Sequence, residues 1–314
     1  MRAFIIEEFG QPGSVGERPK PEPGEGEILV RVKAAGVNAM DPIFRAGYAQ
    51  GFMEHRMPLT PGLDYAGTVE AVGPGVNGFA PGDEVFGAVG KMHAGDGSFA
   101  EYVTANAAVA AKRPEALPVD QAAALPTAGG TAMAAVDALA AADGDSVAVV
   151  GAAGGVGSIA TQLAAARGLR VIAVTRGEHA DFVRGLGAAE VVDYTEGDVA
   201  AQLRQRHPEG VAAIVDLFDD APGAAALAGA VRPGGRIVSP TAMGLDQALA
   251  GQAVTGHLVR AALDRAGELG DLAAARRLTI ETEVLPLDRA AEALDRQMGK
   301  KVRGKQVLAI NGDA

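Results

Sequence analysis

A glycine cluster that follows a short apolar run is the segment whose residue types and spacing most clearly indicate chemistry. Residues 145–158 read D-S-V-A-V-V-G-A-A-G-G-V-G-S and lead into an alanine-rich stretch with helical periodicity. This order is typical of a strand, a tight turn and a helix whose first N–H groups face a pyrophosphate. Gly154 and Gly155 lie where the phosphate would approach, and Gly157 lies where the helix must pack closely on the strand. Ala152 stands in place of the first glycine of the usual pattern, but the segment still predicts a dinucleotide-binding site.

The residues after the second strand of this pattern indicate which dinucleotide fits. In NAD-binding proteins an acidic side chain about 20 residues after the glycines binds the 2′-hydroxyl of the adenosine ribose. This sequence has Thr175 and Arg176 there, a hydroxyl and a guanidinium suited to a 2′-phosphate through charge-assisted hydrogen bonds. The pattern favours NADPH over NADH, unless Arg176 is an ordinary solvated arginine of a loop.

Strand and helix patterns alternate around the glycine cluster. The expected strands after it lie at residues 170–174, 190–192, 211–216 and 235–239. Alanine-rich segments of helix length separate them, which predicts a parallel sheet covered by helices on both faces. The fold class is therefore α/β, with a doubly wound parallel sheet of the Rossmann type at the centre of the chain.

The first 118 residues have a different character, because they are rich in Gly and Pro and carry short strands of period two. These strands are expected at residues 27–34, 64–72, 84–89 and 99–104. They predict an antiparallel, barrel-like domain. We place this domain at residues 1–118 and the nucleotide-binding domain at 119–265, and we expect residues 266–314 to return to the first domain. In the last part we expect a helix at 263–277, a strand at 279–285, a helix from 288 and a strand at 306–310.

Composition excludes several classes of protein. The chain of 314 residues has 28 Lys and Arg against 39 Asp and Glu, a net charge of −11 that repels nucleic acids. It has no cysteine, which excludes disulfides, iron–sulfur clusters and thiolate zinc sites. The first residues turn acidic after a few apolar ones, so we expect no signal peptide, no membrane span and a cytoplasmic location.

Seven segments, taken together, carry a resemblance to a known family. They are A-A-G-V-N-A-M-D (34–41), P-L-T-P-G-L-D-Y-A-G-T-V-E-A-V-G (58–73), P-G-D-E-V-F-G (81–87), G-S-F-A-E-Y-V (97–103), A-A-A-L-P-T-A-G-G-T-A (122–132), G-A-A-G-G-V-G-S (151–158) and V-R-G-K-Q-V-L (302–308). In order and spacing the chain resembles the zinc-free quinone oxidoreductase group of the medium-chain dehydrogenases/reductases, which includes zeta-crystallin. The resemblance implies a GroES-like β-barrel catalytic domain, a Rossmann domain and NADPH as cofactor.

The resemblance also implies a reaction, the transfer of a hydride without metal to a quinone or an α,β-unsaturated carbonyl. Asn38, Tyr48 and Thr127 would then lie around the nicotinamide and the acceptor as hydrogen-bond donors. Tyr48 could alternatively serve only as an apolar wall. Asp41 belongs to the same motif, but we interpret it as a helix cap because it precedes a proline.

Further cofactor and metal expectations follow from the resemblance. Val156 would join the glycines at the pyrophosphate, Tyr194 would lie beside the adenosine phosphate, and Lys305 would be a further phosphate ligand or a partner of surface carboxylates. The places of the zinc ligands in related alcohol dehydrogenases are taken by Asn38, by Leu63 with Asp64, and by Thr127. These side chains cannot form that zinc site, and the five histidines have no metal-ligand spacing.

A local concentration of aromatic and methionine residues predicts a hydrophobic substrate pocket. Its members are Phe44, Tyr48, Phe52, Met53, Met57 and Met92, and Gly90 is among the glycines of its rim. A small quinone, enone or enal would suit such a pocket. Two other functions stay open, namely a zinc-independent alcohol dehydrogenase or carbonyl reductase, and a non-catalytic NADPH-binding protein.

The segment 251–259 predicts the last strand of the parallel sheet, at an edge that lacks lysine and proline. Similar reductases pair such edges around a two-fold axis, so we expect a homodimer. The alternative is that a helix from Arg260 covers the edge within one chain.

Overall fold

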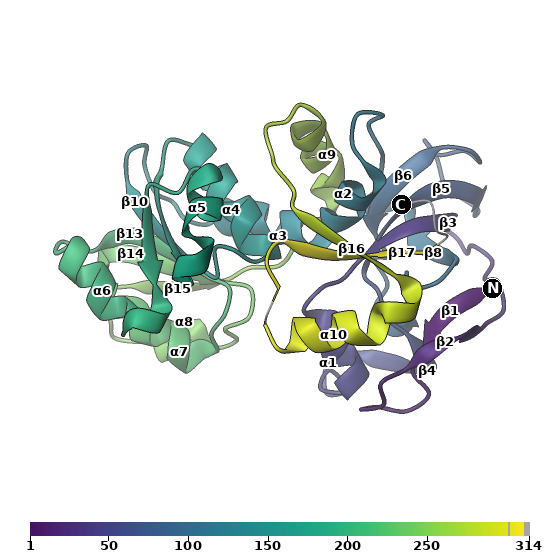
Figure 1. Ribbon diagram of the computed structural model, residues 1–314, viewed down its shortest axis with the longest axis horizontal. Coiled ribbons are helices and arrows are strands. Elements are labelled where there is room, and N and C mark those ends of the chain that lie inside the picture. The colour runs from purple at the N-terminus through teal and green to yellow at the C-terminus, as the bar shows by residue number, and fades with distance from the viewer. Residues whose placement is uncertain (301, 311–314) are drawn as a thin grey trace. The chain divides into compact units, whose positions relative to one another are not determined.

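The structure, a computed structural model, describes residues 1–300 and 302–310. Its internal contacts divide the chain into two units. The first unit is Met1–Gly130 together with Leu263–Ala314, and the second is Thr131–Ala262. Figure 1 shows strands gathered in each of them. The division lies inside the helix Pro126–Asp137 rather than at residue 118. The helix before it, at 119–124, packs on strands of the first unit and belongs to that unit.

A largely antiparallel sheet forms the first unit. Its order is β16-β17-β3-β5-β6-β9, with β8 also paired to β3. The apolar side chains of β3 at Ile28, Val30 and Val32 are buried, as the period of two requires. The strand bounds are β1 Arg2–Ile5, β2 Ser14–Glu17, β3 Glu27–Gly36, β4 Glu54–Thr60, β5 Asp64–Val72, β6 Glu84–Ala88, β7 His93–Asp96, β8 Tyr102–Asn106, β9 Ala110–Lys112, β16 Thr282–Pro286 and β17 Lys305–Ala309. Since β17 pairs with β3, the carboxyl-terminal segment belongs to this unit.

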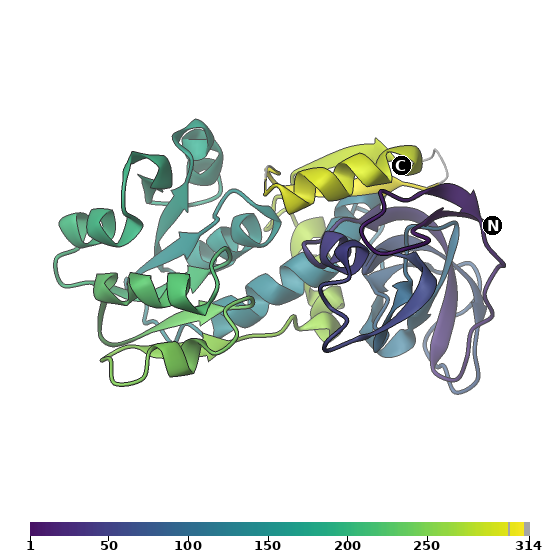
Figure 2. The same ribbon diagram turned by 90° about the horizontal axis from the view of Figure 1, so that it is seen from below.

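Short helices surround this sheet. Their bounds are α1 Met40–Ala46, α2 Val119–Ala124, α3 Pro126–Asp137, α9 Ala266–Ala274 and α10 Ala290–Met298. Helix α10 lies beside α1 (Figure 1 and Figure 2), and an ion pair of 2.5 Å joins Arg45 to Asp295. Helix α2 packs against β3 and β5, and α3 continues from it into the second unit.

The second unit is built on a parallel sheet of order β12-β11-β10-β13-β14-β15. This is the strand order of a Rossmann fold, with the reversal beside the first strand. The strands are β10 Ser146–Val150, β11 Arg170–Thr175, β12 Glu190–Asp193, β13 Val211–Asp216, β14 Val231–Ser239 and β15 Thr255–Leu258. The helices are α4 Gly155–Ala166, α5 Ala180–Gly185, α6 Val199–Arg206, α7 Ala221–Ala226 and α8 Leu245–Ala248. The predicted fold class, a GroES-like domain with a Rossmann sheet, is confirmed.

Three predicted elements differ from the structure. The strand expected at 251–259 is limited to Thr255–Leu258, and Val254 is buried in the core of the second unit before the strand begins. The helix expected from Arg260 is absent there, since α9 begins only at Ala266 and belongs to the first unit. The strand expected from Phe99 begins at Tyr102, because the backbone of Phe99 bonds to Phe4 and Pro61 instead.

Candidate functional site

The glycine turn of the second unit has the geometry that its sequence predicts. Gly151 follows β10 with a φ of +81°, in the left-handed region that favours glycine. Helix α4 then begins at Gly155, with Gly154 as its N-cap residue. A Cβ atom on Gly157 would lie 2.2 Å from the carbonyl oxygen of Gly151, so only glycine permits this approach of helix and strand. Ala152 is buried, and Val156 lies in the first turn of α4.

The end of β11 brings two of the predicted cofactor residues together. Nε of Arg176 donates a hydrogen bond of 2.8 Å to the hydroxyl of Tyr194, and both side chains are exposed. Thr175 is only 4% exposed, so Arg176 and Tyr194 form the outer surface here. Glu178 lies 3.7 Å from a terminal nitrogen of Arg176. The arrangement presents a guanidinium, held by a phenol, at the place where NAD-binding proteins have an acid.

A buried carboxyl beside this turn was not among the predicted site residues. Asp216 ends β13 directly next to the end of β10, and its Oδ1 accepts the backbone N–H groups of Phe218 and Asp219. Its Oδ2 is buried without a hydrogen-bond partner among the described residues. Burial and the nearby Asp219 raise the pKa of Asp216 to about 6. An apolar strand that ends on an acid is the signal that could have indicated it.

In the first unit, two of the three predicted catalytic residues meet on Asp64. Nδ2 of Asn38 donates to Oδ2 of Asp64 at 3.0 Å, and Oγ1 of Thr127 donates to Oδ1 at 2.6 Å. The backbone N–H of Thr127 adds longer contacts to the same carboxylate at 3.1 and 3.2 Å. Asp64 begins β5 and Thr127 is the second residue of α3, so the carboxylate also anchors a helix N-terminus. The hydroxyl proton of Thr127 and one amide proton of Asn38 are therefore both used in hydrogen bonds to Asp64.

Lys305 completes this buried cluster. Its side chain comes from β17, is 5% exposed, and donates to the carbonyl oxygen of Val37 at 2.7 Å and to Oδ1 of Asn38 at 2.6 Å. Both roles expected for Lys305, a phosphate ligand or a surface ion pair, are thus wrong. Lysine is rarely fully buried unless it is paired, and here the negative charge of Asp64 faces it. We call Asn38, Asp64, Thr127 and Lys305 the polar cluster.

Asp41 connects the polar cluster to α1. It accepts the backbone N–H of Asn38 at 2.7 Å and that of Gly62 at 2.9 Å. The interpretation of Asp41 as a helix cap is therefore wrong, because the N-cap residue of α1 is Ala39 and Asp41 lies in the first turn, where its carboxylate binds the backbone of Asn38 and Gly62 instead. Burial raises the pKa of Asp41 to about 7, although these two hydrogen bonds lower it. Burial also raises the pKa of Asp64 and lowers that of Lys305, and the attraction between the two charges opposes both shifts.

The side chains that were predicted to line one hydrophobic pocket lie in different environments in the structure. Tyr48, Phe52 and Met92 are exposed by 74%, 67% and 89% respectively. Phe44 instead belongs to the core of the first unit, where its ring packs edge-on against His55. Pairing of β4 with β7 brings the segment after Phe52 beside the segment after Met92. The apolar side chains near the end of α1 thus form an exposed surface rather than a closed pocket.

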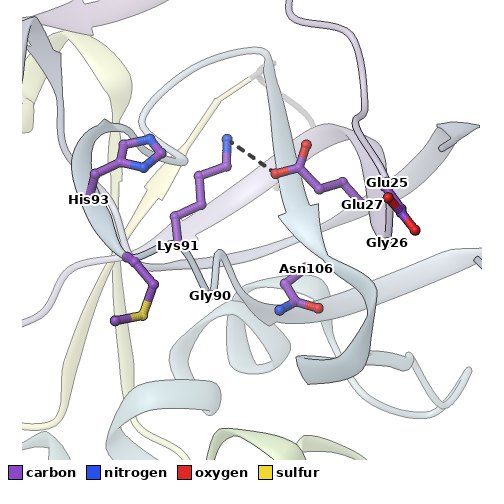
Figure 3. A pocket seen from close by; sticks show the side chains of 8 residues that line it. Glu25, Gly26, Glu27, Gly90, Lys91, His93 and Asn106 are labelled. Atoms are coloured by element: carbon purple, nitrogen blue, oxygen red, sulfur yellow. Dashed lines mark ion pairs between the residues drawn. The ribbon is translucent and has the colours of Figure 1, made fainter. Parts of the chain in front are cut away.

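Gly90 and Met92 line a pocket of about 380 Å³, but its walls are polar. Figure 3 shows Lys91 pointing toward Glu27, whose carboxylate lies 3.8 Å from the ammonium. The same ammonium donates to Oγ1 of Thr104 at 2.5 Å, and burial lowers the pKa of Lys91. The remaining lining residues are Glu25, Gly26, His93 and Asn106. The expected apolar lining is therefore wrong for this part of the surface.

Residues 1–300 and 302–310 lack two features that would bear on function. No group of three or more His, Cys, Asp or Glu side chains there is placed to hold a metal ion. No helix within this part of the chain has the length and hydropathy needed to cross a membrane.

Comparisons with known proteins agree with this geometry. Residues 24–115 match the alcohol dehydrogenase GroES-like domain family, and residues 186–308 match the family described as zinc-binding dehydrogenase. An alcohol dehydrogenase of Geobacillus stearothermophilus is 32% identical over 342 residues, covering 99% of this chain and 100% of the relative. The structure of the quinone oxidoreductase from Coxiella burnetii superposes with a TM-score of 0.88 at 29% identity, over 99% of both chains.

A further solved structure contains a cofactor. The quinone oxidoreductase of Escherichia coli complexed with NADPH superposes with a TM-score of 0.86 at 25% identity, over 99% of this chain and 100% of the other. The glycine turn, the strand order and these similarities together indicate an oxidoreductase that uses a nicotinamide cofactor. The chain belongs to the medium-chain dehydrogenase/reductase family, in which its relatives include quinone oxidoreductases.

Proposed function

We propose that this protein is an NADPH-dependent reductase that transfers a hydride, without a metal ion, to a quinone or an α,β-unsaturated carbonyl. The observation that carries the choice of cofactor is the contact between Arg176 and Tyr194 at the end of β11. A guanidinium binds the 2′-phosphate of NADPH, which NADH lacks. The NADPH complex of the related Escherichia coli enzyme supports this choice.

In this proposal the second unit binds the cofactor. Gly154, Gly155, Val156 and Gly157 hold the pyrophosphate at the start of α4, whose first N–H groups point outward. Ala152 precedes them in the turn. Arg176 binds the 2′-phosphate, and the hydroxyl of Tyr194 accepts a hydrogen bond from its guanidinium. Thr175, the last residue of β11, is buried and directly precedes Arg176 in the sequence. Bound NADPH supplies the hydride.

Replacement of Arg176 by alanine tests the cofactor assignment. We expect the variant to lose about 1–3 kcal/mol of its preference for NADPH over NADH, the range for a charge-assisted hydrogen bond. Dissociation constants of both cofactors, measured by nicotinamide fluorescence, give this preference. Arg184→Ala is the matched control, because Arg184 is an exposed arginine of the same unit whose ion pair is with nearby Asp181. Equal affinity of the wild-type protein for NADH and NADPH would refute the assignment.

The first unit contacts the acceptor in this proposal. The exposed phenol of Tyr48 donates a hydrogen bond to the oxygen that gains charge when the hydride arrives. Asn38 and Thr127 position the reactants, since their own protons are directed at Asp64. The exposed side chains of Phe52 and Met92 add apolar surface for a hydrophobic quinone or enone.

The residues at the place of the zinc site do not fit a zinc ion. Asn38 and Thr127 are poor zinc ligands, and Asp64 is occupied by hydrogen bonds from both. The ammonium of Lys305 lies 2.6 Å from Oδ1 of Asn38 and would repel a cation there. We expect full activity after exhaustive treatment with a chelator, and less than about a tenth of a zinc ion per chain by elemental analysis. Stoichiometric zinc whose removal stops turnover would contradict this.

An alcohol dehydrogenase is the second candidate, because the relative from Geobacillus stearothermophilus carries that description. Without zinc, an unactivated alcohol is a more demanding substrate than an enone or a quinone. Rates with alcohol and NADP⁺ are to be compared with rates for a panel of enones, enals and quinones with NADPH. We expect turnover only in the second set. Cofactor binding without any turnover would instead indicate a non-catalytic NADPH-binding protein.

We further propose that the protein forms a homodimer through β15. This strand pairs with β14 on one side and has no strand partner on its other edge among the described residues. Leu258 is half-exposed on it, whereas Val254 is buried and unsuitable as a probe. We expect a dimeric mass by light scattering at micromolar concentration, shifted toward monomer by Leu258→Asp. Met298→Asp, at an exposed position of α10, is the control. A monomeric wild-type protein would overturn the proposal.

A further inference from the structure

Lys305 is buried in a position that determines how the amide of Asn38 is oriented. An ammonium can only donate hydrogen bonds, so the group of Asn38 that faces it at 2.6 Å must be the carbonyl oxygen. The amide nitrogen then faces the carboxylate of Asp64 at 3.0 Å and the carbonyl oxygen of Gly36 at 3.4 Å. Rotating the amide by half a turn would place NH₂ against the ammonium and oxygen against the carboxylate. Charge alone therefore selects one orientation.

The carboxylate of Asp64 also fixes the orientation of Thr127. It accepts the hydroxyl proton of Thr127 at 2.6 Å as well as the backbone N–H at the start of α3. A protonated Asp64 could not accept all of these bonds, because one of its oxygens would itself become a donor. The direction of the Thr127 hydroxyl thus depends on an ionised Asp64, and the charge of Lys305 favours that ionised form.

We propose that Lys305 and Asp64 are positioning residues of the reaction site, which act by fixing the side chains of Asn38 and Thr127. This inference rests on the proposed function, in which Asn38 and Thr127 position the nicotinamide and the acceptor. Lys305 comes from the last described strand, 267 positions after Asn38. Strand β17 is thereby part of the site, because Lys305 acts through Asn38 and Asp64.

The charged and titratable groups around Asp64 are few. Lys305 faces it from β17, Asp41 from α1, and the phenol of Tyr65 lies beside it on β5. Within the described part of the chain, Asp41 accepts its hydrogen bonds from the backbone N–H groups of Asn38 and Gly62, not from the Asn38 amide or the Thr127 hydroxyl. When Lys305 becomes neutral, the main opposing charge is lost and the pKa of Asp64 rises further.

The test compares rate against pH for the wild type and for Lys305→Met, with NADPH and a reactive quinone or enone. We expect kcat of the variant to be about tenfold or more below wild type at pH 6. The ratio should rise toward one as the pH rises, because an ionised Asp64 still accepts the amide of Asn38 and the hydroxyl of Thr127 when the ammonium is missing. The dissociation constant of NADPH should not change, because the second unit binds its phosphates. A merely structural defect would lower the rate equally at every pH.

Two further variants keep the test decisive. Lys305→Met combined with Asp64→Asn removes both charges, and it should show a lowered rate whose ratio to wild type no longer recovers at high pH. If Lys305→Met alone fails to fold, the pH profile of the double variant can still be compared with that of the wild type. Lys33→Met, which breaks a half-exposed ion pair with Glu84, should leave the pH profile unchanged. An active wild type with a pH-independent ratio for Lys305→Met would overturn the inference, whereas a wild type inactive with every acceptor would overturn the proposed function as well.

Discussion

Replacement of Gly157 by alanine should destabilise the second unit by about 3 kcal/mol and weaken NADPH binding at least about a hundredfold. The added Cβ atom would lie 2.2 Å from the carbonyl oxygen of Gly151 and 2.7 Å from Cα of Ala152. Both are backbone atoms, so no side-chain rotation relieves the overlap and α4 must move away from β10. The helix start and the turn that hold the pyrophosphate would separate. Urea unfolding and a fluorescence titration with NADPH measure the two effects.

Gly154→Ala is the matched control three residues earlier. Gly154 has a φ of −78°, and a Cβ atom there would meet only the carbonyl oxygen of Gly151 at 3.4 Å, an ordinary contact. Stability should stay within about 0.5 kcal/mol of wild type, but NADPH should bind more weakly because the methyl group occupies the path of the phosphate. Gly185→Ala, which adds a methyl group in open space at the end of α5, should change neither. Wild-type stability of Gly157→Ala would disprove the close approach of helix and strand.

Local patterns predicted the elements that depend on local chemistry. The bounds of the strands 64–72 and 211–216 agree with the prediction to the residue. The continuous apolar run of 211–216 matches its complete burial, whereas 64–72 is buried without alternation at its first four residues. Val254 is a residue for which an apolar pattern predicts the wrong backbone structure. It is apolar and buried but lies outside β15, since a side chain can enter the core without its backbone joining the sheet. A sequence pattern reports burial, not hydrogen bonding.

The site residues also differ in how far they could be predicted from local sequence. Gly157 and Arg176 could be predicted because a turn, a helix start and a strand end fix them within one continuous segment. Lys305 and Asp64 could not, because the hydrogen bond of Lys305 to Asn38, which also brings its charge near Asp64, depends on β17 lying beside β3. Lysine is almost never buried, so a surface position was the better expectation from sequence. The available signal was a lysine at the first position of a short strand that continues into the apolar run at residues 307–309.

Lys305→Met should lower the free energy of unfolding by about 3–5 kcal/mol, because the buried carboxylate of Asp64 would lose its main opposing charge. Methionine fills a similar volume with an apolar stem, so the loss comes mainly from charge. Asp64 would keep its hydrogen bonds from Asn38 and Thr127 but lose the ammonium that faces it. Oδ1 of Asn38 and the carbonyl oxygen of Val37 would also lose their donor. Urea unfolding at pH 8 measures the change, because Asp41 is then largely ionised and its charge adds to that of Asp64.

The double variant Lys305→Met with Asp64→Asn separates charge from packing. If the uncompensated carboxylate causes the loss, making position 64 neutral should restore about half of it, since an unpaired buried charge is worse than no charge. Lys33→Met is the control for removing a lysine from the same unit, and it should lose less than about 1 kcal/mol because its ion pair with Glu84 is half-exposed. Equal stability of the single and double variants would mean that Asp64 does not need the ammonium. The cluster would then be held by its hydrogen bonds alone, and the end of the chain would stabilise the first unit only through the packing of β17 on β3.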